Sequence, residues 1–213
     1  MPGRRVSHPL FARVFERASV AMDRAGGARH RHRLVTGLHG LVVEVGAGNG
    51  RNFAHYPQTV TRVLAVEPEA RLRAAAREAA AGAPVPVTVT DGLAEALPLA
   101  DGVADALVAS LVLCSVADQA GALSEAYRVV RPGGQLRFFE HVRSRSSGLR
   151  RVQRVVDATC WPLLCGGCHT GRDTLTAIGD AGFVVTELDR FRFPPSTVAG
   201  PAAPHVLGTA LRP

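Results

Sequence analysis

Lysine is absent from the 213-residue sequence, and all 25 of its basic residues are arginines. We attribute this to a bias towards GC-rich codons, since alanine, glycine and valine are abundant. Such a bias does not explain the net charge of +7, which arises because the chain has only 18 acidic residues. The surplus lies in two segments: Arg4 to Arg33 has eight arginines and two acids, and Arg143 to Arg154 has five arginines and no acid. The rest of the chain is therefore mildly acidic.

Long apolar runs are also missing. The longest, Leu107 to Ala117, is far shorter than the roughly 20 residues of a membrane-spanning helix. Near the N-terminus, Arg13, Glu16 and Arg17 interrupt any apolar run long enough for an export signal. We therefore expect a cytoplasmic protein, with docking of the first helix on a membrane surface as a disfavoured alternative.

Cysteine is scarce, with four residues, and a reducing compartment favours free thiols over disulfides. Residues 165–169 spell C-x-x-C-H, which in an exported chain would suggest covalent haem. A zinc site from Cys160, Cys165, Cys168 and His169 is a second alternative, but the other half of a paired-ligand spacing is missing. We expect free thiols and no metal.

The hydrophobic pattern predicts one α/β domain. An amphipathic helix is expected at 9–25 and a basic loop at 26–32. Short apolar runs rich in β-branched residues then alternate with helical segments, which predicts a parallel sheet with helices on both faces. The expected strands are 40–45, 63–66, 85–89, 104–110, 135–142, 183–192 and 205–211, and the expected helices are 50–56, 69–81, 118–130 and 172–181.

A glycine-rich loop follows the first of these strands. Glu44 precedes Gly46, Ala47, Gly48 and Gly50, and glycines allow a sharp turn and close contact between backbone and ligand. Its spacing differs from the G-x-G-x-x-G of dinucleotide-binding loops. Glu67 ends the next strand, where an acid can accept hydrogen bonds from ribose hydroxyls. Together these features predict a nucleoside ligand.

Five ordered motifs resemble those of class I S-adenosylmethionine methyltransferases. They are Glu44-x-Gly46-x-Gly48-x-Gly50, Glu67-Pro68, residues 92–98 (GLAEALP), Asp101-Gly102-x-x-Asp105 and residues 128–134 (RVVRPGG). The resemblance implies a Rossmann-like methyltransferase fold, a seven-stranded and mostly parallel sheet whose last strand is antiparallel. Separately, the amphipathic helix before the first strand predicts an N-terminal helical lid or cap at 1–35, ahead of a methyltransferase domain at 36–213.

The same resemblance implies S-adenosylmethionine as cofactor and suggests how it is bound. Glu44 would lie near the methionine amine, Gly46, Ala47 and Gly48 beneath the methionyl and ribose part, and Glu67 with Pro68 at the ribose. Leu93 and Ala94 would border the adenine, and Ser110 would offer its carbonyl to the amine. Leu93 departs from the family, because many relatives have Asp or Asn there.

A closer resemblance, to the methyltransferase-like group that includes alkyl thiol S-methyltransferases, extends from about residue 40 to the end. It is carried by Asn52-Phe53-x-x-Tyr56-Pro57, residues 111–116 (LVLCSV), Phe139-Glu140-His141-Val142, Gly167-Cys168-x-x-x-Arg172-Asp173-Thr174 and residues 204–208 (PHVLG). The implied substrate is a small-molecule thiol. Mammalian members carry a membrane anchor, and we expect none here.

His141 is the candidate catalytic residue. A thiol must lose its proton before it attacks the methyl group, and His141 lies at the end of the fifth predicted strand, where a base or positive charge would promote ionisation. A role in fixing the adjacent loop is the alternative. The acceptor atom could instead be oxygen, nitrogen or carbon of a natural product or quinone. The arginine segments allow a nucleic-acid substrate, but they lack interleaved aromatics, so no nucleic-acid partner is expected.

Overall fold

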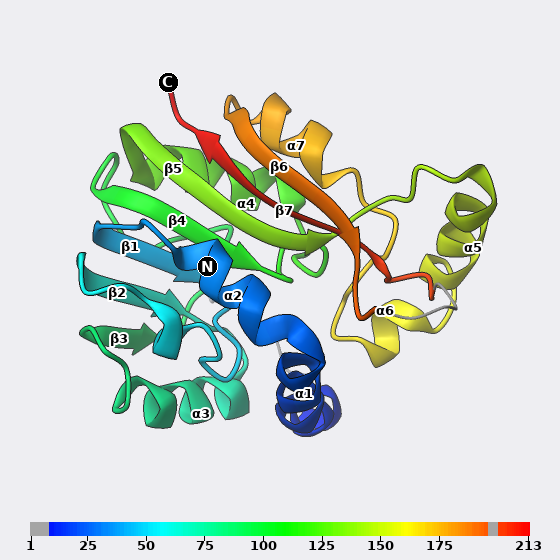
Figure 1. The fold of residues 1–213 in the computed structure, drawn as a ribbon, viewed down its shortest axis with the longest axis horizontal. Coiled ribbons are helices and arrows are strands. Elements are labelled where there is room, and N and C mark those ends of the chain that lie inside the picture. The colour runs from blue at the N-terminus through cyan, green and yellow to red at the C-terminus, as the bar shows by residue number, and fades with distance from the viewer. Residues whose placement is uncertain (1–8, 196–199) are drawn as a thin grey trace.

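The computed structural model describes residues 9–195 and 200–213, so Arg4, Arg5 and the rest of 1–8 lie outside the described residues. A single seven-stranded sheet runs through it, with strand order β3-β2-β1-β4-β5-β7-β6 (Figure 1). Its neighbouring strands are parallel, except for the two pairs that β7 makes with β5 and β6, which are antiparallel. The strands are β1 Gly40–Val45, β2 Val60–Val66, β3 Val87–Thr90, β4 Ala104–Ser110, β5 Val130–His141, β6 Val184–Arg192 and β7 Pro204–Leu211. The predicted α/β architecture with its antiparallel last strand is confirmed.

Helices cover both faces of the sheet. One apolar core joins the sheet to α4 (Gln119–Val129) and α7 (Thr174–Asp180), and includes Leu123, Ala126 and Ile178. The other joins it to α2 (Ala28–Val35) and α3 (Ala70–Ala80), and includes Leu34 and Ala76. Successive strand residues point to opposite faces, so β4 supplies Leu107 to the first core and Val108 to the second.

The predicted loop at 26–32 is wrong. A π-helical turn (η1, Asp23–Gly27) and then α2 occupy these residues, and the kink between them is absorbed at Gly26, whose φ is 112°. Arg31 is only 5% exposed and pairs with Asp23 at 2.8 Å, so its charge is neutralised inside the protein instead of being solvated. The basic composition of residues 26–32 therefore led to the prediction of a loop, although these residues belong to helical segments with a buried face.

The predicted helix at 50–56 is also wrong. These residues form turns and one short 3-10 helix (η2, Phe53–His55). Pro57 follows shortly after, and a proline disfavours helical geometry in the residue before it. The sharp turn buries the Phe53 ring under the sheet and places Tyr56 beside β1.

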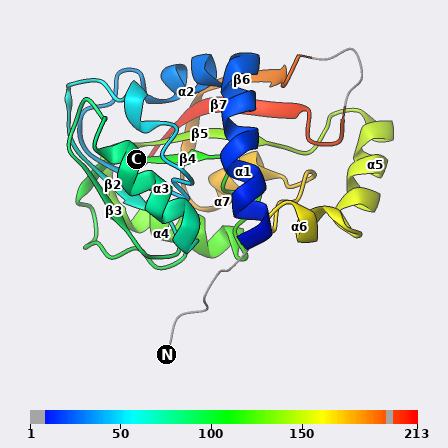
Figure 2. The same cartoon turned by 90° about the horizontal axis from the view of Figure 1, so that it is seen from below.

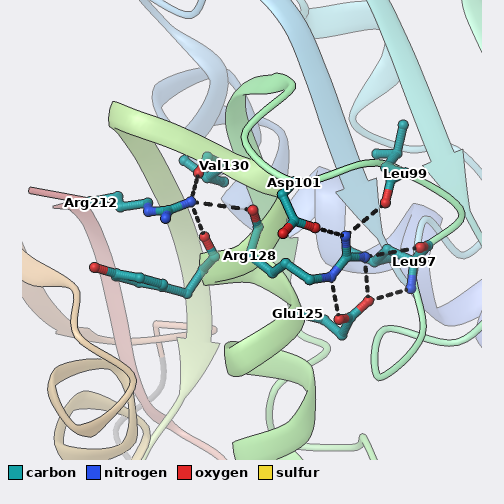
Figure 3. A network of polar contacts seen from close by, with 8 residues as sticks. Leu97, Leu99, Asp101, Glu125, Arg128, Val130 and Arg212 are labelled. Atoms are coloured by element: carbon teal, nitrogen blue, oxygen red, sulfur yellow. Dashed lines mark hydrogen bonds and ion pairs between the residues drawn. The ribbon is translucent and has the colours of Figure 1, made fainter.

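Two arginines organise the start of β5 (Figure 3). The Arg128 guanidinium donates to the carboxylates of Glu125 and Asp101 and to the carbonyls of Leu97 and Leu99, and Glu125 in turn accepts from the Leu97 N–H. Arg212 donates to the carbonyls of Tyr127, Arg128 and Val130, which the end of α4 leaves without helical partners. The loop after β3 is thereby tied to α4 and to the C-terminal segment.

Three helices lie beyond the carboxyl ends of the strands. Figure 1 shows α1 (Pro9–Met22) end-on and Figure 2 shows it lengthwise, across this edge of the sheet. In both views α5 (Ser147–Asp157) and α6 (Trp161–Leu164) project at one side. The second arginine-rich segment is therefore largely on α5, away from the glycine loop. Among the described helices, none has the length and hydropathy that a membrane span requires.

Candidate functional site

The sequence-predicted ligand residues gather at one edge of the sheet. Strands β1 to β5 are parallel, so their carboxyl ends share this edge, as in open sheets that bind ligands there. It carries the end of β1 with the glycine loop, the residues after β2 and β3, and the ends of β4 and β5. The residues so placed are Glu44, Gly46, Ala47, Gly48, Glu67, Pro68, Leu93, Ala94, Ser110 and His141.

The glycine loop requires glycine for two reasons. Gly46 and Gly48 both have φ of 57°, a region that other residues rarely adopt. A Cβ on Gly46 would lie 2.5 Å from a Val112 methyl group, and a Cβ on Gly48 would lie 3.1 Å from the Phe15 ring. Ala47 is buried, and its N–H donates to the Val66 carbonyl. The loop thus forms a cradle of bare backbone between β1 and the segments that cross it.

Glu67 is fixed against this loop. Its Oε2 accepts from the Gly48 N–H at 2.7 Å and its Oε1 from the Glu69 N–H at 2.9 Å. Burial raises the pKa of Glu67 against the opposing effect of these two hydrogen bonds. Pro68 lies next to it, and its carbonyl, like that of Glu67, accepts from Arg73. The carboxylate is held at the end of β2, the position expected of a ribose acid.

Glu44 lies in the centre of a buried polar network. Its two carboxylate oxygens accept from the Asn52 amide at 2.8 Å and from the Tyr56 hydroxyl at 2.7 Å. Burial raises the pKa of Glu44 to about 7, although both hydrogen bonds favour the charged form. Burial also raises the pKa of Tyr56, with the Glu44 carboxylate adding to the effect. The motif Asn52-Phe53-x-x-Tyr56 is thus the support of Glu44, a role that the sequence alone did not reveal.

Arg31 extends the network and was missed by the sequence analysis. Its guanidinium donates to Asn52 Oδ1 at 2.9 Å, to Ser110 Oγ at 3.3 Å and to Asp23 at 2.8 Å. Asp23 also pairs with Arg51 of the glycine loop. Arg31 therefore connects α2 to Asn52 in the turn after β1 and to Ser110 at the end of β4. The sequence analysis assigned Arg31 to a loop and so gave it no role in the site.

Leu93 and Ala94 form part of the tight turn after β3. Leu93 is bridged to Ala96, and its carbonyl accepts from the Ala96 N–H at 3.1 Å. Ala94 is buried in the same core cluster as Val66 and Val112. The segment just beyond is held by Arg128 (Figure 3), so the turn has a fixed place at the edge.

The loop after β4 has strained backbone and a carboxylate anchor. Among the residues that the structure describes, Leu111 is the one non-glycine residue with positive φ, 60°, and such outliers concentrate at functional sites. Glu140, fully buried, accepts from the N–H groups of Val112, Leu113 and Cys114. Burial raises the pKa of Glu140, while these bonds oppose the rise. Glu140 therefore has a structural role, holding the backbone of the loop after β4.

His141, the predicted catalytic residue, faces two thiols. Its Nδ1 lies 3.5 Å from the Cys168 sulfur, and Cys114 completes a group whose ligand atoms all lie within 4.8 Å of one another. Cys114 and burial raise the pKa of Cys168, so its thiol stays protonated at neutral pH. The edge of the His141 ring meets His205, whose pKa burial lowers to about 3.

The cysteines of the chain are free thiols. His169, a member of the C-x-x-C-H run, lies with its Nδ1 2.8 Å from the Gly167 carbonyl oxygen. Within the described residues, the conceivable set Cys160, Cys165, Cys168 and His169 is not brought together as a ligand group.

The first helix crosses the glycine loop. Asn49 donates to Ser19 at 3.0 Å, and Phe15 lies over Gly48. Asn49 Oδ1 is buried and has no hydrogen-bond partner among the described residues. The bare-backbone cradle, the fixed Glu67 carboxylate and this free acceptor fit a ligand that carries hydroxyl and amino donors, as S-adenosylmethionine does.

Comparisons with known proteins identify the family. The methyltransferase domain family matches residues 43–138. Human thiol S-methyltransferase TMT1B is 34% identical over 184 residues, which covers 84% of this chain and 74% of TMT1B. Human thiol S-methyltransferase TMT1A is 32% identical over 177 residues, covering 80% and 70%.

A solved structure shows the same fold. Geranyl diphosphate C-methyltransferase from Streptomyces coelicolor, in complex with Mg²⁺, geranyl diphosphate and S-adenosyl-L-homocysteine, has a TM-score of 0.67 at 16% identity, covering 89% of this chain and 79% of that one. The chain therefore belongs to the family of S-adenosylmethionine-dependent methyltransferases that includes the thiol S-methyltransferases TMT1A and TMT1B.

Proposed function

We propose that this protein transfers a methyl group from S-adenosylmethionine to the sulfur of a small-molecule thiol. The observation that carries the proposal is the 34% identity to a thiol S-methyltransferase over 84% of the chain. Cofactor contacts are assigned to Glu44, Gly46, Ala47, Gly48, Glu67, Pro68, Leu93, Ala94 and Ser110. Their common place at the carboxyl edge of the sheet supports this assignment.

The cofactor supplies an activated methyl group on a sulfonium, so the protein has to align donor and acceptor and exclude water. Glu67 would hold the ribose hydroxyls from its fixed position at the end of β2. Glu44 would present negative charge towards the methionine amine through its network. The first helix, Pro9–Met22 within the described residues 9–35, would act as a lid, which is supported by its contacts with Gly48 and Asn49.

His141 is the proposed catalytic residue on the acceptor side. A free thiol with a pKa near 8.5 is only a few per cent ionised at neutral pH, so a group that promotes its ionisation raises the rate. The position of His141 at the end of β5, beside the loop that follows Ser110, supports this role.

The proposal is tested by incubating the purified protein with S-adenosylmethionine and a panel of matched acceptors. Each thiol is paired with the alcohol, phenol or amine of the same skeleton, and RNA is included. Formation of S-adenosylhomocysteine is expected with the thiols and not with their oxygen or nitrogen counterparts. Turnover on phenols without turnover on thiols would contradict the thiol acceptor, and salt-sensitive methylation of RNA would contradict a small-molecule substrate.

The role of His141 has its own readout. The His141→Ala variant is expected to lose most activity at neutral pH and less at high pH, where the acceptor thiol ionises unaided. An equal loss at every pH would show that His141 only positions the loop. The variant Cys160→Ser, at an exposed cysteine, is the matched control and should behave as the unmodified protein.

A further inference from the structure

Three side chains that can bind a metal come from distant parts of the chain and meet at the end of β5. Cys114 comes from the loop after β4, His141 from the end of β5 and Cys168 from the loop between α6 and α7. The two sulfurs and a ring nitrogen all lie within 4.8 Å of one another, and both cysteines are buried. No disulfide joins these thiols, so all three groups are available as ligands.

Their separation matches a tetrahedral zinc site. With Zn–S bonds of about 2.3 Å and Zn–N bonds of about 2.0 Å, a tetrahedral ion places sulfur and nitrogen ligands about 3.5 Å apart and two sulfurs about 3.8 Å apart. The distance between Cys168 Sγ and His141 Nδ1 is 3.5 Å. Small side-chain rotations of the cysteines therefore suffice to surround an ion.

The ligands are held by the fold and not only by one another. The Glu140 carboxylate accepts from the backbone N–H of Cys114, and the Cys114 carbonyl accepts from His169. The backbone N–H of Cys168 donates to the Cys165 carbonyl. These backbone hydrogen bonds fix where the chain carries the two cysteines, so the thiols meet without a metal present.

We propose that Cys114, His141 and Cys168 bind a Zn²⁺ ion that leaves one coordination position open for the acceptor thiol. Cys114 and Cys168 release their thiol protons to solvent as the ion binds. The resulting two thiolates and one imidazole are the ligand set of a known class of catalytic zinc site, in which the fourth position takes water or substrate. No fourth Cys, His, Asp or Glu ligand joins the group within the described residues. The inference rests on the proposed thiol acceptor and specifies how His141 promotes its ionisation.

The chemistry balances without a further reactant. The acceptor thiol loses its proton to solvent when its sulfur coordinates the ion, because a coordinated thiol is deprotonated. The thiolate sulfur then forms a bond to the methyl carbon as the bond from that carbon to the sulfonium sulfur breaks. The products are a methyl thioether, which is a weaker ligand and leaves, and S-adenosylhomocysteine. In this arrangement His141 acts as a ligand, and no separate base is needed.

The first experiment measures metal binding without an acceptor. Protein expressed with added Zn²⁺ and purified under reducing conditions is expected to retain one ion per chain. The variants Cys114→Ser, Cys168→Ser and His141→Ala should each bind Zn²⁺ more than about 100-fold more weakly. Cys160→Ser should retain the ion. Zinc-free protein that fails to take up Zn²⁺, or equal affinity in the three ligand variants and the control, would overturn the site.

The second experiment tests the open position. Protein loaded with Co²⁺ should show thiolate-to-cobalt charge-transfer absorption, and an acceptor thiol should change that spectrum while its alcohol counterpart should not. Removing Zn²⁺ with a chelator should lower kcat/KM for the thiol at least about tenfold, with recovery on adding Zn²⁺ back. An unchanged spectrum, or full activity after zinc removal, would overturn the role of the ion.

The two proposals fail in different ways. Zinc bound by the three ligands in a protein that methylates phenols and no thiols would remove the thiol acceptor and leave the metal site. Methylation of thiols by protein that binds no zinc would remove the metal site and leave the thiol acceptor, with His141 then acting on the thiol directly.

Discussion

Glu67 accepts a hydrogen bond from the backbone N–H of Gly48, with a distance of 2.7 Å between nitrogen and oxygen. Its other carboxylate oxygen accepts from the Glu69 N–H at the start of α3. One side chain therefore connects the end of β2, the glycine loop and a helix N-terminus. Because all three elements line the candidate cofactor site, the position of this carboxylate determines the shape of the part of the site that would hold the cofactor ribose.

Glu67→Ala is expected to weaken S-adenosylhomocysteine binding by about 10- to 100-fold. Hydrogen bonds to a charged group contribute about 1.5–3 kcal/mol, and each 1.4 kcal/mol is a factor of ten in affinity. Calorimetric titration measures the change. Glu78→Ala, exposed on α3, is the matched control and should bind as the unmodified protein. Unchanged affinity in Glu67→Ala would show that another group holds the ribose.

Glu44 should make folding stability depend on pH. Its pKa is raised from 4.5 in the unfolded chain to about 7 in the folded protein. The contribution of Glu44 to stability is therefore fully present below about pH 4.5 and is lost as pH rises through about 7, by about 3 kcal/mol in total.

Urea unfolding at several pH values measures this effect. The free energy of unfolding should fall more steeply between about pH 5 and 8 in the unmodified protein than in Glu44→Gln, which cannot titrate. If the two pH profiles run parallel, the Glu44 carboxylate titrates alike in the folded and unfolded chain, and burial does not control its charge.

The sequence predicted the sheet and the common place of the candidate cofactor residues at its edge because both depend on local patterns. Apolar runs marked all seven strands, and the ends of β1 and β2 located Glu44 and Glu67. Successive residues of a strand point to opposite faces, and Glu140 and His141 accordingly make separate contacts. These features follow from chain geometry within a few residues.

What the sequence could not predict depends on contacts between distant segments. Arg31 looked like one charge in a basic loop, and only the fold brings it to Asn52 and Ser110. Cys114, His141 and Cys168 are separated by 27 residues in each interval, so no local ligand spacing links them. Cys168 belongs to the C-x-x-C-H run, whose pattern indicates Cys165 and His169 as its partners, but neither of these residues belongs to the group.

Phe15 offers a test of the lid. Its ring lies over Gly48, where a Cβ would come within 3.1 Å, so it covers the cradle of the glycine loop. Phe15→Ala is expected to raise the dissociation rate of S-adenosylhomocysteine several-fold, because removing the ring opens a path to solvent, and to change the association rate less. Stopped-flow displacement separates the two rates. Val14→Ala, on the exposed side of the same helix, is the control, and equal rates in both variants would exclude a lid role for Phe15.

Arg31 is expected to stabilise the fold as well as the site. It is 5% exposed and shares an ion pair with Asp23, whose side chain is 7% exposed. Removing one partner of a buried pair typically destabilises by about 3–5 kcal/mol when the other charge is left without compensation. Asp23 keeps its ion pair with Arg51. Arg31→Met should therefore lower the free energy of unfolding by less than this, about 1–3 kcal/mol, and weaken cofactor binding through Asn52 and Ser110.

A control lies on the same helix. Arg33 pairs with Asp189 at 2.9 Å, but both side chains are more than 40% exposed, and such surface pairs contribute less than about 1 kcal/mol. In urea unfolding, the free energy of unfolding should be clearly lower for Arg31→Met than for Arg33→Met. The double variant Asp23→Asn with Arg31→Met should recover part of the stability lost in Arg31→Met, because the buried carboxylate is then neutral. If Arg31→Met and Arg33→Met unfold at the same urea concentration, the buried contacts of Arg31 contribute no more to the free energy of unfolding than the exposed pair of Arg33. The packing of Leu34 and Val35 then holds α2 in place.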